Sequence, residues 1–176
     1  MIYPPAEDSF LMFEILKQKL PGLLQKNPNL KFLEIGAGSG IHLQTAKTFG
    51  VKNISSSDID NEAVCHCKSL GFSCIKSNLF KKIKERFDLI IFNPPYLPED
   101  LQEPEESQLA TTGGKQGSEV INRFLKQAKK NLSKDGKIFL LVSNLTKGIK
   151  WGTWKKKKVG EKKVFMELLK VYELTS

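Results

Sequence analysis

The stretch KFLEIGAGSGIHLQTAKTFG, residues 31–50, decides the fold. A short apolar segment is followed by Gly36, Gly38 and Gly40, and then by a longer segment that closes on Gly50. This order predicts a strand, a tight glycine turn and a helix. Glycines at such a turn also let a ligand lie against the backbone at the start of the helix. The stretch therefore predicts both a βαβ unit and a ligand site.

Strands and helices alternate on both sides of this stretch. Helices are expected at 8–20 (ended by Pro21-Gly22), 41–50, 61–71 and 118–132, and strands at 31–36, 53–60, 73–78, 87–93 and 136–143. Such alternation is typical of a parallel sheet with helices on both faces. Residues 151–160 and 162–174 predict an antiparallel hairpin at one edge of the sheet, which gives seven strands in a single domain over residues 1–176.

The length and the composition fit an ordinary globular domain. With 176 residues, 40% of them hydrophobic, the chain can bury one core, and no apolar run approaches the ~20 residues of a membrane span. The N-terminus lacks the layout of a signal peptide, so we expect a cytoplasmic protein without a membrane contact. Cys65 and Cys67 flank His66, but neighbours on a helix diverge and no second ligand cluster exists, so no metal site is expected.

The net charge of +9 is unevenly distributed. Residues 150–163 contain seven lysines and one acid, so this segment alone supplies +6, whereas residues 99–106 contain five acids and no base. The lysine-rich segment is consistent with a solvated strand edge or with a nucleic-acid contact. The sequence leaves that choice open.

Two acidic residues end the first two strands. Glu34 precedes the glycine turn by two residues, where a carboxylate suits a cationic ligand with an amine or a sulfonium group. Asp58 ends the second strand, where a carboxylate can accept hydrogen bonds from both hydroxyls of a ribose. Asp60 is expected to cap the next helix instead.

The stretch DLIIFNPPYLPED, residues 88–100, ends a buried strand on two prolines. Pro94 and Pro95 cannot donate a backbone hydrogen bond, and they stiffen a loop at the carboxyl end of the strand. Asn93 offers a side-chain acceptor, the Pro94 carbonyl a second one, and Tyr96 a flat face. Two fixed acceptors and a flat face suit a planar NH2 group on an sp2 carbon, whose nitrogen they would direct at a methyl donor. Neither histidine is needed as a base.

Together, these motifs resemble the S-adenosylmethionine site of Rossmann-like, class I methyltransferases. The resemblance implies cofactor contacts from Glu34, Gly36, Gly38, Gly40, Asp58, Asn78 and Asn93, and catalysis at Asn93, Pro94, Pro95 and Tyr96. Asn78 stands where that family usually has Asp. Its amide oxygen can still accept from an adenine NH2, although Asn78 could instead cap the following turn.

Three further segments resemble the archaeal and eukaryotic branch of the HemK-like glutamine N5-methyltransferases: YPPAEDSFLM (3–12), ATTGGKQGSEVINRFL (110–125) and KKVFMELLKVYEL (162–174). The resemblance implies methylation of the glutamine in the Gly-Gly-Gln loop of a class I release factor. It also implies a small zinc-binding activator as a heterodimeric partner, and we expect it to pair with the edge strand at 72–77.

Further expectations concern the N-terminal residues, the segment before the last strands and the identity of the methyl acceptor. Residues 1–22 are expected to form a leader and a helix that cover the cofactor. Residues 144–155 are too short for the helix that relatives place before the last strands. The pocket by itself also fits adenine N6 in DNA or RNA, which is the alternative acceptor, although the five acids after it would repel a phosphate backbone.

Overall fold

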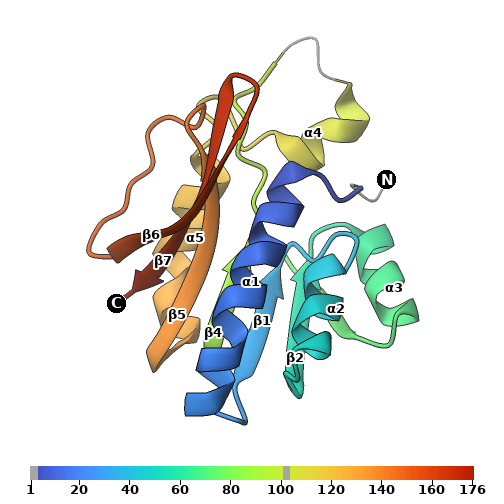
Figure 1. Cartoon of the computed structure of the whole chain (residues 1–176). Coiled ribbons are helices and arrows are strands. Elements are labelled where there is room, and N and C mark those ends of the chain that lie inside the picture. Colours follow the sequence, from blue (N-terminus) through green and yellow to red (C-terminus); the bar gives the residue numbers. More distant parts are fainter. Residues whose placement is uncertain (1–3, 101–103) are drawn as a thin grey trace.

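The computed structural model describes residues 4–100 and 104–176. It contains a seven-stranded sheet (Figure 1) in the order β3-β2-β1-β4-β5-β7-β6. The strands are β1 (Lys31–Ile35), β2 (Asn53–Asp58), β3 (Ser73–Lys76), β4 (Phe87–Phe92), β5 (Leu132–Ser143), β6 (Lys155–Val164) and β7 (Glu167–Thr175). The first five strands are parallel, and β7 is antiparallel to both of its neighbours. The predicted seven-stranded, mostly parallel sheet with a C-terminal hairpin is confirmed.

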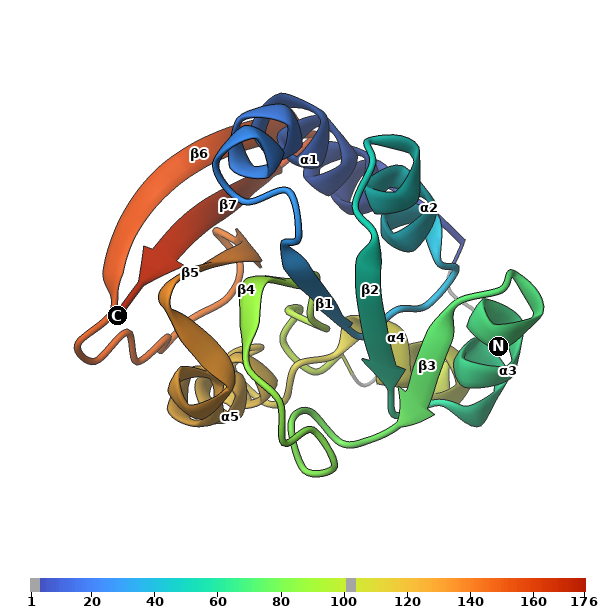
Figure 2. The ribbon, with the colours of Figure 1, turned by 90° about the horizontal axis from the view of Figure 1, so that it is seen from below.

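Helices cover both faces of the sheet, as Figure 2 shows for α1 and α2 on one side and α5 on the other. These helices are α1 (Glu7–Lys26), α2 (Ile41–Thr48), α3 (Asn61–Ser69) and α5 (Glu119–Ala128). Residues of α1, α2 and α3 share one buried cluster with the sheet, which includes Leu16, Phe32 and Leu43. Residues of α5 share a second cluster that includes Phe124 and Ile90. The apolar face of each helix thus fixes the layer in which it lies.

The first helix does not end where the sequence predicted. It continues through Pro21 to Lys26, because Leu20 is fully buried and Leu23 and Leu24 pack against the same core. A proline removes only one helical hydrogen bond, and this packing of the last turn offsets the loss. The local stop signal was therefore outweighed by tertiary contacts.

Three further boundaries differ. The helix expected at 118–132 ends at Ala128 and continues as a 3-10 turn, Lys129–Asn131, after which β5 begins at Leu132 rather than at Gly136. The hairpin turn lies at residues 165–166, not near residue 161. A short helix, α4 (Glu105–Thr111), was not expected from the sequence.

The order of the strands places the glycine turn and the Asn-Pro-Pro-Tyr loop at one edge of the sheet. β1 is hydrogen-bonded to β2 on one side and to β4 on the other. The chain adds β2 and β3 on one side of β1 and then crosses over to add β4 and β5 on the other side, so the strand order reverses between β1 and β4. Ligands bind at the carboxyl ends of the strands beside such a reversal. In the described part of the chain, no helix is long and apolar enough to cross a membrane.

Candidate active site

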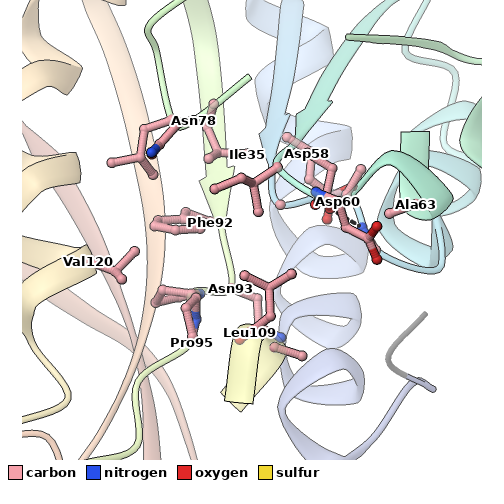
Figure 3. Close-up of a pocket in the computed structure, with 18 of the residues that line it drawn as sticks. Ile35, Asp58, Asp60, Ala63, Asn78, Phe92, Asn93, Pro95, Leu109 and Val120 are labelled. Atoms are coloured by element: carbon pink, nitrogen blue, oxygen red, sulfur yellow. Dashed lines mark hydrogen bonds between the residues drawn. The ribbon is translucent and has the colours of Figure 1, made fainter. Parts of the chain in front are cut away.

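A cavity of about 550 Å³ lies at the carboxyl ends of β1, β2 and β4. Figure 3 shows Asp58 and Asp60 on one side of it and Asn78, Phe92, Asn93 and Pro95 on the opposite side. This volume lies within the range of small-molecule sites, ~300–1,000 Å³. The residues that line it include Glu34, Gly36, Gly38, Asp58, Asn78, Asn93, Pro94 and Pro95, whereas Gly40 and Tyr96 do not line it.

The glycine turn brings bare backbone to this cavity. Gly36 and Gly38 have φ values of +70° and +48°, a region that L side chains rarely adopt. The Gly36 and Ala37 amides donate to the Ser57 carbonyl at 2.8 and 3.2 Å, which ties the turn to β2. Gly40 instead lies against α3, because a Cβ there would be 3.1 Å from Leu70. Gly40 thus packs two helices together at the start of α2.

Asp58 is buried at the end of β2 and fixes the turn. Its Oδ2 accepts from the Gly38 amide at 2.9 Å, and its Oδ1 accepts from the Asp60 amide at 2.8 Å. Burial raises the pKa of the Asp58 carboxyl, and these two hydrogen bonds oppose that rise. Each oxygen retains a second lone pair, so the carboxylate can still accept from a diol. Asp60 accepts from the Glu62 amide at 2.9 Å and caps α3, as the sequence predicted.

Glu34 belongs to a buried chain of hydrogen bonds. Its Oε1 lies 2.7 Å from His42 Nδ1, and His42 Nε2 lies 3.0 Å from the Ser9 carbonyl. Burial raises the pKa of Glu34. Burial would lower the pKa of His42, but the Glu34 carboxylate and its hydrogen bond raise it overall. The buried Glu34 Oε2 has no hydrogen-bond partner among the described residues, and Glu34 lines the cavity. An orphaned carboxylate oxygen of this kind suits a cationic donor.

The turn after β3 is fixed by a neighbour of Asn78. Ser77 Oγ donates to the Leu79 carbonyl at 2.9 Å and accepts from the Lys82 amide at 3.1 Å. Asn78 itself is exposed and lines the cavity, and its backbone carbonyl accepts from the Lys81 amide at 3.2 Å. The side-chain role that Asn78 could have taken in the turn thus belongs to Ser77.

Asn93 is held by a residue that the sequence argument missed. Its Nδ2 donates to Asp8 Oδ2 at 3.0 Å, and the Tyr96 hydroxyl lies 3.4 Å from the same oxygen. Because a carboxylate only accepts, the NH2 group of Asn93 must face Asp8, and its Oδ1 must point away. That Oδ1 is buried and has no partner among the described residues. Asn93 therefore presents a desolvated acceptor next to the cavity.

A glycine-rich segment supports the Asn-Pro-Pro-Tyr loop from behind. The Gly113 amide donates to the Leu97 carbonyl at 2.9 Å, and a Cβ on Gly113 would lie 2.1 Å from the Gly117 carbonyl oxygen and 2.6 Å from that of Pro95. Such distances are impossible for a real side chain, so only glycine fits. On the other side, Thr146 Oγ1 donates to the Tyr96 carbonyl at 2.8 Å.

Asp8 begins the range predicted for the first helix, but the N-cap residue is Ala6, and the Asp8 side chain is buried. Asp8 and Ser9 line the cavity, which brings the start of α1 to the predicted cofactor site. In the sequence, Asp8 is an acid among apolar residues at the start of a helix, where acids commonly serve as caps, so its position along the chain does not indicate that it contacts Asn93. Of the five acids at 99–106, Glu99 lines the cavity; residue 103 lies outside the described part of the chain.

The cavity fits a molecule with one apolar and one charged part. Ile35, Phe92 and Val120 form an apolar wall (Figure 3), and the orphaned Glu34 Oε2 supplies a negative group. Nothing lies within 4 Å of the place where a Cβ on Gly38 would be, so the turn leaves open space for a ligand. Apolar walls with a few polar groups are typical of ligand sites.

Residues 14–151 match the family model of the methyltransferase small domain. A putative protein N5-glutamine methyltransferase of Methanocaldococcus jannaschii is 37% identical over 153 residues, which cover 82% of this chain and 74% of the relative. The eRF1 methyltransferase catalytic subunit mtq2 of Schizosaccharomyces pombe is 32% identical, over 81% of this chain and 72% of the relative.

Among solved structures, the ribosomal protein L11 methylase of Lactobacillus delbrueckii subsp. bulgaricus is similar with a TM-score of 0.66. The match covers 99% of this chain and 81% of that one at 14% sequence identity. This likeness shows the shared methyltransferase fold.

Proposed function

The chain belongs to the protein N5-glutamine methyltransferases, and we propose that it methylates a glutamine side chain of a translation release factor with S-adenosylmethionine as its cofactor. The observation that carries this proposal is the Asn93 carboxamide. Its NH2 group is occupied by Asp8, and its buried Oδ1 is left without a partner beside the cavity.

The chemistry follows from what a substrate amide needs. The nitrogen of a carboxamide is a poor nucleophile because its lone pair is delocalised into the carbonyl group. Asn93 Oδ1 and the Pro94 carbonyl would accept its two N–H bonds, enrich the nitrogen and direct its lone pair toward the methyl group. Positive charge would grow on the nitrogen as the N–C bond forms and the methyl–sulfonium bond breaks, so both acceptors would stabilise the transition state more than the ground state. The methylated amide would then return to neutral by releasing one N–H proton to water. Alignment supplies the remaining rate enhancement.

When bound, S-adenosylmethionine supplies an electrophilic methyl group on a sulfonium. Four groups of this chain would hold it: the Gly36–Gly38 backbone, the orphaned Glu34 oxygen toward the cationic end, Asp58 toward the ribose and Asn78 toward the adenine. Burial of Glu34 and Asp58 strengthens such contacts, because little water competes there. Asp8 and Ser9 would close the site from α1.

The release factor is the proposed substrate because its modified residue presents the required group on an uncharged loop. Several relatives are named release factor glutamine methyltransferases, among them that of Streptococcus pneumoniae at 31% identity. Glu99 at the cavity would disfavour a nucleic-acid backbone.

An activator protein is the proposed partner, and β3 is its proposed docking strand. The name of the mtq2 relative describes that protein as a catalytic subunit. Here β3 ends the sheet and is hydrogen-bonded to β2 alone, while Ile75 is 39% exposed on it. An edge with an exposed apolar residue is suited to strand addition.

Labelled S-adenosylmethionine tests the proposal. The chain, with and without a candidate activator, is given an intact release factor, the same factor with its Gly-Gly-Gln glutamine replaced by alanine, and adenine-containing RNA and DNA. We expect label on the natural factor only, and loss of that label in the Asn93→Ala enzyme. Label on nucleic acid, or on the alanine-substituted factor, would contradict the glutamine assignment.

A further inference from the structure

The turn between β6 and β7 carries two apolar side chains with almost no contacts. Phe165 is 94% exposed and Met166 is 91% exposed, far more than any other exposed large hydrophobic residue in the described part of the chain. Phe165 also has a φ of +52°, which favours glycine or asparagine. We call residues 164–167 the hairpin tip.

The fold does not require these side chains. A two-residue hairpin turn is formed best by sequences such as Asn-Gly, which accept positive φ and are hydrated easily. Phe165 and Met166 contribute nothing to the two buried clusters of the sheet. Single exposed apolar residues are common, but an adjacent pair that projects from an unfavourable turn is typical of a contact surface. Phe and Met are also enriched in protein–protein interfaces.

Hydrogen bonds connect the hairpin tip to the Asn-Pro-Pro-Tyr loop through residues 144–146. In Figure 1 the β6–β7 turn lies at the same end of the molecule as α4 and the start of α1. Leu168, which follows the tip, exchanges hydrogen bonds with Asn144 at 2.7 and 3.0 Å. Thr146, two residues after Asn144, donates to the Tyr96 carbonyl at 2.8 Å. A molecule that presents its side chain to Asn93 can therefore reach the tip with an adjoining surface.

The charges beside the tip are mostly basic, although the tip itself includes Glu167. β6 contains six lysines and one acid, and that acid, Glu161, is paired with Lys158. Lys162 pairs with Glu7 of α1, whereas Lys156 lies over Trp151 at 4.4 Å and therefore on the other face. Lysines divided between the two faces of a strand form a weaker track for one nucleic-acid backbone than lysines on a single face would. They do favour acidic side chains around an apolar contact.

We propose that the hairpin tip is a docking surface for the protein substrate, and that it binds an apolar patch flanked by acidic residues next to the methylated loop. The inference rests on the proposed function. Phe165 and Met166 supply the contact area, Lys163 and its neighbours select for negative charge, and the bonds through Leu168 and Thr146 hold this surface in register with the catalytic loop.

The test compares a large and a small substrate. The double variant Phe165→Gly with Met166→Asn places glycine at the residue of this turn that has a positive φ, so the fold is retained. We expect its KM for the intact release factor to rise about 10-fold or more, with kcat and the S-adenosylmethionine affinity unchanged. A short synthetic peptide that contains Gly-Gly-Gln should be methylated equally well by both enzymes, because it cannot reach the tip.

Two charge-reversal variants of β6 supply the matched control. Lys163→Glu, next to the tip, should raise the same KM, whereas Lys155→Glu, at the far end of β6, should not. An unchanged KM for the intact factor in the double variant would overturn the docking surface while leaving the proposed function intact. The docking surface would also be overturned if the double variant lost affinity only for a stem-loop RNA, or only for phosphatidylserine–phosphatidylcholine vesicles, and not for the release factor. A wild-type enzyme that methylates neither factor nor peptide would instead remove the proposed function, and the docking surface with it.

Discussion

Replacement of Asp8 by Asn tests whether this residue sets the orientation of the Asn93 amide. Asp8 Oδ1 accepts from the Ser9 amide at 2.7 Å, and Oδ2 accepts from Asn93 Nδ2 at 3.0 Å. A carboxamide has the same shape but only one oxygen. Whichever way it turns, its NH2 group faces another donor, on Ser9 or on Asn93. The variant must therefore lose one of the two contacts, or Asn93 must turn its own NH2 group toward the substrate.

The magnitude follows from the bond that is lost. A hydrogen bond to a charged group is worth about 1.5–3 kcal/mol, and the 3.4 Å contact from the Tyr96 hydroxyl is too long to add much. If this energy is lost from the transition state, kcat falls about 10- to 150-fold, since each 1.36 kcal/mol is one factor of ten. The fold should lose about 1–3 kcal/mol of stability as well, because the buried shape is conserved but one buried donor is left without an acceptor.

The assay is single-turnover transfer of labelled methyl to a release factor, with S-adenosylmethionine affinity measured separately by calorimetry. We expect the affinity to change less than kcat does, because asparagine keeps the shape of the side chain that lines the cavity and the glycine turn is untouched. Glu14→Gln is the control: Glu14 is exposed on the same helix and pairs only with Lys17, at 4.0 Å, among the described residues. A wild-type kcat in Asp8→Asn would refute the positioning role, and an equal loss of cofactor affinity would relocate the effect.

Three further predictions concern other residues, one of them with a control outside the site. Asp58→Ala should weaken S-adenosylmethionine binding by about 2–3 kcal/mol through lost charge-assisted hydrogen bonds, and calorimetry that gives the wild-type affinity would reject Asp58 as a ligand. Gly113→Ala should abolish methyl transfer and lower the Tm, because its Cβ would lie 2.1 Å from a carbonyl oxygen. Gly22→Ala is the control: a Cβ there has nothing within 4 Å, so the substitution should stabilise the helix by roughly 0.5–1 kcal/mol in thermal unfolding. The stability that His42 contributes, measured against His42→Gln, should be fully present below pH 6.5 and decline as the pH rises through its folded-state pKa, since burial opposes the charge but Glu34 raises that pKa. A contribution that grows with pH would contradict this sign.

Much of the fold is readable because it depends on local patterns. The period-two and helical patterns of residues 31–143 predict the βαβ units, and right-handed parallel connections leave few ways to assemble them. The acids at 34 and 58 and the loop at 93–96 each end a strand, so the parallel sheet must bring them to one edge. That is why most of the predicted site residues line a single cavity.

The boundaries were less readable because tertiary contacts compete with local signals. Pro21 is a local stop, yet burial of Leu20 and the packing of Leu23 carry α1 onward. Gly40 belongs to the same glycine turn as Gly36, but it packs against Leu70 rather than lining the cavity. Spacing along the chain does not distinguish a glycine that faces a ligand from one that faces a helix.

The sequence by itself determined the class of sheet, the position of the site at the carboxyl ends of the strands and the loop that would hold an NH2 substrate, because each follows from a motif within a few neighbouring residues. Only the tertiary structure decided that Asp8 orients Asn93, which lies 85 positions later, and that His42 supports Glu34. A carboxylate selects its partner when burial removes water as a competitor, and which groups are buried together is a property of the assembled layers rather than of the chain.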